Sequence, residues 1–174
     1  MAVLTEENVK YILSELKKRI EKSMGVVNAM QQHSVNFENW VQIEMCDILN
    51  GYIAKGDVIE IEKRGNVDIR ICGGNNNKVA IEIKILLSGK SGKAKRLADV
   101  VKLDKFDENI EKAILWVVYK RPKGEIDCEY YIKEVSEYIG SRSIVNELEG
   151  FVLGDDSREK IKVILYLNRW NSIH

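Results

Sequence analysis

The stretch KVAIEIKILL, residues 78–87, indicates the fold class, because it reads as a buried strand that nevertheless carries two opposite charges. Side chains alternate between the two faces of a strand, so Glu82 and Lys84 lie on one face. A cross-strand ion pair on an exposed face is the simpler interpretation. The apolar residues on either side are unusual for an exposed strand, and they favour a functional site instead.

Two shorter alternating stretches precede it and predict two more strands. DVIEIEKR (57–64) and VDIRIC (67–72) both have a period of two residues, and the turn-rich GGNNNK (73–78) predicts a hairpin into the strand of Glu82. Asp68 is a charge among apolar neighbours in the second stretch. The hairpin would place it opposite or diagonal to Glu82 and Lys84.

The rest of the chain predicts helices and strands in alternation. Helices are expected over 5–24, 36–52, 97–110 and 127–140, and strands over 112–121, 143–153 and 160–170. The first helix has Thr5 as its expected N-cap. The predicted order is α-α-β-β-β-α-β-α-β-β, which is an α/β domain with a mixed sheet. Residues 1–174 are expected to form a single domain.

Composition limits the classes of function. The chain is 45% hydrophobic and 31% charged, with 27 basic and 27 acidic residues, which is typical of a globular protein without a strong net field. Neutrality argues against a purely electrostatic nucleic-acid coat protein but allows a local basic groove. Cys46, Cys72 and Cys128 form no CxxC pair, so free thiols are expected rather than disulfides or zinc. No long apolar run or signal peptide is evident, and we expect a soluble cytoplasmic protein that does not enter membranes.

Asp68, Glu82 and Lys84 together indicate a chemistry. Two carboxylates held close together repel each other, and a divalent cation removes that repulsion. Carboxylate oxygens, water and phosphate are the ligands that Mg²⁺ prefers. An adjacent ammonium group can orient a water molecule or stabilise charge on a phosphate. The three residues therefore predict a metal-dependent site that acts on phosphate esters.

Asp68, thirteen intervening residues and Glu82-Ile83-Lys84 resemble the signature of the PD-(D/E)xK nuclease superfamily. The element order over residues 37–119 also resembles its restriction-endonuclease-like core, α-β-β-β-α-β with a mixed sheet flanked by helices. An N-terminal helix and C-terminal strands would be additions to that core. The resemblance implies an Mg²⁺-dependent nuclease, with Mn²⁺ as a possible substitute, and implies that Asp68 and Glu82 bind the metal beside Lys84.

The resemblance also implies a glutamate on the first core helix. Glu44 is the first match, as a metal ligand and catalytic residue, because it lies among apolar positions. Glu38 is the second, and the two are too far apart around a helix to face one site together. The first strand of the meander offers Glu60 or Glu62, for which solvated roles are the stronger interpretation.

The segment SGKSGKAKR (88–96) is rich in glycine and basic residues. It lacks the spacing of a nucleotide-binding loop. It can grip nucleic-acid phosphates or be an ordinary solvated loop, and both interpretations stay open. Its candidate nucleic-acid-binding residues are Lys90, Lys93, Lys95 and Arg96.

Two functions follow as hypotheses. The first is an endonuclease that hydrolyses phosphodiester bonds, with DNA as the expected substrate and a homodimer giving one site per strand of a duplex. The alternative is a catalytically inactive module of the same fold that binds nucleic acid or a protein partner. Whether DNA or RNA is the substrate stays open.

Overall fold

The computed structural model describes residues 4–23, 25, 37–61, 67–73, 76–87, 93–106, 110–120, 137, 144–153 and 161–170. In chain order the elements are α1 (Glu6–Lys22), α3 (Phe37–Asn50), β1 (Asp57–Ile61), β2 (Ile69–Gly73), β3 (Asn76–Leu87), α4 (Lys93–Asp104), β4 (Glu111–Lys120), β5 (Ile144–Leu153) and β6 (Ile161–Trp170). Among these residues, no helix is both long and apolar enough to span a membrane.

Helix α1 begins where its capping residue predicts. The Thr5 side chain accepts a hydrogen bond from the Asn8 backbone N–H at 3.2 Å. Glu6 and Glu7 follow in the first turn, where their negative charges interact favourably with the helix dipole. The buried stripe of α1 is Val9, Ile12, Leu13, Leu16 and Ile20. These are the apolar positions at helical spacing, so the prediction of this helix is confirmed.

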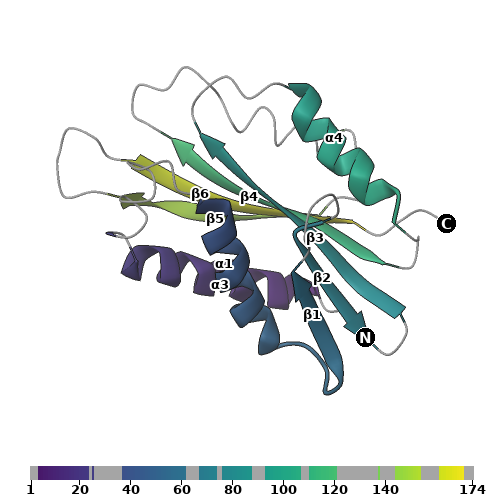
Figure 1. Ribbon diagram of the computed structural model, residues 1–174. Coiled ribbons are helices and arrows are strands. Elements are labelled where there is room, and N and C mark those ends of the chain that lie inside the picture. Colours follow the sequence, from purple (N-terminus) through teal and green to yellow (C-terminus); the bar gives the residue numbers. More distant parts are fainter. Residues whose placement is uncertain are drawn as a thin grey trace.

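The described strands form one mixed sheet in the order β1-β2-β3-β4-β6-β5 (Figure 1). Strand β2 pairs antiparallel with both β1 and β3, which confirms the hairpin expected at residues 73–78. Strand β3 pairs with β4 in parallel, and a parallel pair needs a crossover connection. Helix α4 supplies that crossover.

The sheet separates two layers of helix. Figure 1 shows α1 and α3 on one face and α4 on the other. Alternate residues of β3 follow this division, because Val79, Ile81 and Ile83 belong to the core formed with α1 and α3. Glu82 and Lys84 point the other way, toward α4. The alternation read from the sequence therefore places both charges under a helix rather than in solvent.

Helix α4 is fixed to the sheet along its length and at its end. Val100 and Leu103 are fully buried. The buried Lys112 of β4 donates a hydrogen bond from Nζ to the Phe106 carbonyl oxygen at 3.1 Å. The Arg70 guanidinium lies 5.3 Å from the centre of the Phe106 ring. These contacts hold the face of α4 that lies over β3.

The α/β class with a mixed sheet is confirmed. Apart from Glu137, the helix expected over 127–140 lies outside the described residues. Cys46 is a buried free thiol and Cys72 a half-buried one, in agreement with the expectation, whereas Cys128 lies outside the described residues. Burial raises the pKa of Cys46 to about 11, so this thiol is not a reactive nucleophile at neutral pH.

Candidate active site

Glu82 is the centre of a charged cluster on β3. Its side chain is almost completely buried, with 2% of the residue exposed. Its Oε1 lies 2.9 Å from Nζ of Lys84, two residues along the same strand. Its Oε2 accepts a hydrogen bond from Nζ of Lys102 on α4 at 3.0 Å. Each oxygen of this buried carboxylate is therefore held by a different ammonium group.

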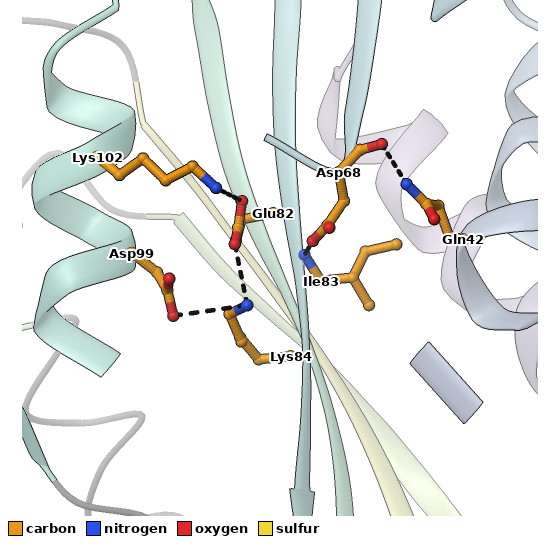
Figure 2. Close-up of polar contacts among 7 residues, drawn as sticks. All are labelled: Gln42, Asp68, Glu82, Ile83, Lys84, Asp99 and Lys102. Carbon is orange, nitrogen blue, oxygen red and sulfur yellow. Dashed lines mark hydrogen bonds and ion pairs between the residues drawn. The ribbon is translucent and has the colours of Figure 1, made fainter. Parts of the chain in front are cut away.

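Helix α4 contributes Asp99 to the cluster in addition to Lys102. Asp99 and Lys102 are three residues apart, so they share one face of the helix. Oδ2 of Asp99 lies 3.7 Å from Nζ of Lys84, and Figure 2 shows Lys84 between this carboxylate and Glu82. The result is a row of alternating charges, Asp99, Lys84, Glu82 and Lys102, between the helix and the strand.

Asp68 approaches the same strand from the side of β2. The pairing of β2 with β3 ends at Ile69 and Ile81, so Asp68 lies immediately before the strand rather than within it. Its Oδ2 accepts a hydrogen bond from the Ile83 backbone N–H at 2.6 Å. Its carbonyl oxygen accepts one from Nε2 of Gln42 on α3 (Figure 2). Asp68 thus occupies the position where β2 leaves β3.

The carboxylate that α3 brings to this position is Glu38. The backbone N–H of Ile85 donates a hydrogen bond to it, two residues along β3 from Ile83, whose N–H is bonded to Asp68. The charges of Lys84, Asp68 and Glu82 all act on Glu38. Glu38 therefore belongs to the cluster, and it was the second of the two helix glutamates considered from the sequence.

The prediction that Glu44 is the helix glutamate of the site needs correction. Its Oε2 lies 2.7 Å from NH1 of Arg19 on α1, and that guanidinium also pairs with Asp47 at 2.7 Å. Glu44 therefore lies on the side of α3 that faces α1. The apolar neighbours that favoured it belong to the core that α3 shares with α1 and the sheet, and they do not show that Glu44 itself reaches the site.

Burial dominates the electrostatics of the carboxylates. Desolvation raises the pKa values of Asp68, Glu38 and Asp99, and the charge of Glu82 adds to each increase. Burial acts in the opposite direction on Lys84 and lowers its pKa, but the charge and hydrogen bond of Glu82 outweigh burial. The pKa of Lys84 is therefore raised, and its side chain is cationic at neutral pH.

The donor chemistry of the cluster suits a hard cation, although its present arrangement does not form a metal cage. Asp68, Glu82 and Glu38 offer only carboxylate oxygens, which Mg²⁺ prefers. In the part of the chain that the structure describes, no three Asp, Glu, His or Cys side chains converge closely enough to hold a metal ion. Both oxygens of Glu82 are instead paired with lysines.

The remaining residues predicted from the sequence lie away from this cluster or outside the described residues. Glu60 is exposed on β1, which β2 separates from β3. Glu62 and Lys90 lie outside the described residues, as do the side chains of Lys93, Lys95 and Arg96. The expectation that the basic segment grips phosphates stays a prediction.

Sequence reasoning missed three residues that the structure brings to this site. Asp99 and Lys102 had a signal, because a spacing of three in a helix next to the signature strand puts both on one face. Gln42 had no such signal in the sequence, since its contact is with the backbone of a residue 26 positions away.

The chain matches no protein-family model, no curated protein and no solved structure.

Proposed function

We propose that the chain is a metal-dependent nuclease of the PD-(D/E)xK kind that hydrolyses phosphodiester bonds, with DNA as the expected substrate. The observation that carries the proposal is the approach of Asp68 and Glu38, from two other elements, to the strand of Glu82 and Lys84. A structural role alone does not require four charges at one place. Apolar side chains would stabilise the sheet equally well.

The proposed mechanism assigns a role to each side chain. Asp68 and Glu82 would hold an Mg²⁺ ion, with Glu38 assisting through a water molecule. When bound, the cation would neutralise phosphate charge and lower the pKa of an attacking water. The raised pKa of Lys84 keeps its ammonium group charged, which suits stabilisation of negative charge on the phosphate better than removal of a proton.

A second candidate function rests on a specific observation. Glu82 is fully paired with lysines, and no metal-binding group is formed by the described residues. A protein that keeps the fold but binds nucleic acid or a protein partner without cleaving would need no more than this. The two candidates differ in whether phosphodiester bonds are broken, so a cleavage assay separates them.

The test is cleavage of supercoiled plasmid by the purified protein in Mg²⁺ or Mn²⁺, with EDTA as the metal-free control. Lys84→Met should slow cleavage by at least about 100-fold, since it removes a charge aimed at the transition state. Lys105→Met is the matched control, because Lys105 is exposed just beyond α4, and it should cleave like the wild type. Equal cleavage by wild type and Lys84→Met would contradict the proposal, and so would complete absence of cleavage.

The assembly proposed with this function is a homodimer, in which each subunit acts on one strand of a duplex. Sedimentation equilibrium at micromolar protein concentration measures the molar mass directly. A single species of 20.0 kDa without DNA, together with a mass of one chain per duplex in its presence, would contradict this part of the proposal.

A further inference from the structure

The two lysines that hold Glu82 are not equivalent. Lys84 belongs to the same strand and also lies near Asp99, so it has a second carboxylate within the cluster. Lys102 comes from α4, and its contact with Glu82 joins two elements of the fold. Exposure does not distinguish the two lysines, because the side chains of Lys84 and Lys102 are 25% and 29% exposed, whereas that of Glu82 is 3% exposed. Lys102 can therefore swing toward solvent, but Glu82 cannot.

The described side chains of the cluster carry more acidic than basic groups, and this favours a cation at this place. Among the described side chains, the four carboxylates of Glu38, Asp68, Glu82 and Asp99 share the two ammonium groups of Lys84 and Lys102. Desolvation and mutual repulsion act on these carboxylates together. Without an ammonium group on Oε2, one oxygen of the buried Glu82 carboxylate would have no positive partner close to the other carboxylates.

We propose that Lys102 occupies the place of the metal on Glu82 in the metal-free protein and must leave Glu82 when the cation binds. Lys102 is then a positioning residue that competes with the metal. It keeps Glu82 oriented while the site is empty and lowers the affinity of the site for divalent cations. This inference rests on the proposed function, because it takes Glu82 to be a metal ligand.

Displacement of Lys102 is physically reasonable. Its ion pair with Glu82 is partly open to water, and partly exposed pairs between flexible lysines and carboxylates are weak. A divalent cation offers Glu82 twice the charge at a shorter distance. The freed ammonium group reaches solvent without any movement of the helix backbone, because lysine has a long, flexible side chain.

The experiment is a calorimetric titration of the full chain with Mn²⁺, in wild type and in Lys102→Met. Methionine keeps the length and helix propensity of the side chain and removes its charge. The variant should bind Mn²⁺ about three- to tenfold more tightly, because the competing ion pair is lost. Lys102→Gln is a second variant, which should show the same direction if Lys102→Met fails to fold.

Lys105→Met is the matched control for net charge. It removes one positive charge from an exposed position three residues along, and it should change the affinity less than about twofold because of screening by solvent. A thermal melt in EDTA gives a second readout. Loss of Lys102 should lower the melting temperature of the metal-free protein, because Glu82 loses a partner, while metal affinity rises. A purely structural lysine would not produce this pair of opposite effects.

The outcomes separate this inference from the proposed function. If wild type and both Lys102 variants bind Mn²⁺ equally, or if the variants bind more weakly, the inference is overturned and the metal site stands. If Lys105→Met tightens binding as much as Lys102→Met, general charge explains the effect and the inference is again overturned. If none of the proteins binds Mn²⁺, the inference and the proposed function fail together. Binding by the Lys102 variants alone would support the inference.

Discussion

The buried carboxylate of Glu82 needs compensating charges, and the rest of the site supplies them. A charge removed from water is stable only with close, well-directed partners, and Glu82 has two. Such an arrangement adds little net stability, since an apolar residue at the same position would pack against Ile114 and Trp116, which lie next to this face of the strand on β4. The cluster is therefore consistent with the proposed function, and stabilisation of the fold does not require it.

The first prediction at this scale compares the two glutamates of α3. Glu38→Gln should lower Mn²⁺ affinity and plasmid cleavage by about tenfold or more, because it removes a charge next to the proposed metal ligands. Glu44→Gln should leave both unchanged and cost less than about 1 kcal/mol of unfolding free energy, the usual value of a partly exposed ion pair. Titration, cleavage and urea denaturation of both variants check this. Loss of activity in Glu44→Gln alone would reverse the assignment.

The second prediction concerns the pH dependence of stability in EDTA. Burial raises the pKa of Asp68 above its unfolded value, so the folded protein binds this proton more tightly than the unfolded chain does. The group's contribution to stability is greatest below its unfolded pKa of about 3.9 and falls as the pH rises through the folded pKa. Asp68→Asn cannot ionise and keeps an oxygen for the Ile83 N–H. Its unfolding free energy relative to wild type should therefore increase from pH 4.5 to 7.5.

Urea denaturation of both proteins at these two pH values measures the difference. Asp104→Asn provides the comparison for removal of one exposed carboxylate at the end of α4, and Asp68→Asn should change more than it does between the two pH values. An advantage for Asp68→Asn that shrinks as the pH rises would contradict the electrostatic account of the site.

At the scale of single residues, the sequence predicted only part of the site. Period-two alternation was enough to place Glu82 and Lys84 on one face. The choice between Glu38 and Glu44 depended on which flank of α3 faces the sheet. That flank is set by the packing of α3 against α1 and β3, and the pairing of Glu44 with Arg19, 25 residues away, follows from it. No local pattern contains such a contact. The electrostatic coupling of Asp99 to Lys84 likewise depends on tertiary packing.

Helix α4 is the element that completes the site, because it carries Asp99 and Lys102 to the open face of β3. Its position depends on two fully buried side chains, Val100 and Leu103, and on contacts of Phe106 at its end. The charged cluster therefore forms only when this helix packs on the sheet. Loosening the helix should weaken the cluster even where no charged residue is changed.

The prediction at this scale compares two positions on the same helix. Leu103→Ala should lower the free energy of unfolding by about 2–4 kcal/mol, because it leaves a cavity under α4. Val101→Ala should cost less than about 1 kcal/mol, since Val101 is 42% exposed. Urea denaturation measures both. Similar losses in the two variants would show that α4 does not pack as described.

The sequence predicted the elements better than their arrangement. Capping by Thr5, helical stripes and strand alternation each depend on neighbours within a few residues, and most of the described helices and strands follow them. Helix α4 is the exception, because it spans Lys93–Asp104 rather than the expected 97–110, so residues 93–96 of the basic segment are helical and not part of a loop. The end of β2 at Ile69, which leaves Asp68 outside the strand, comes from pairing with β3 and was not evident. Sheet order was equally hidden, since β6 lies between β4 and β5 through long-range pairing.

For the whole molecule, the arrangement explains how a chain of zero net charge could act on a polyanion. Acidic groups from α3, β3 and α4 lie near one another along β3. A cation bound by them would make the local charge positive, so that it would attract phosphate. The predicted basic segment directly follows β3 in the chain, and its last four residues begin α4. Local charge, rather than the total, is what the proposed function needs.

The most direct measurement is a crystal structure of the protein grown with Mn²⁺, using the anomalous signal of manganese to locate it. The account predicts one strong peak bonded to carboxylate oxygens of both Asp68 and Glu82, at about 2.1–2.2 Å, with Lys102 withdrawn from Glu82. Manganese bound elsewhere, or no peak while Asp68 stays on the Ile83 N–H and Glu82 on its two lysines, would contradict it.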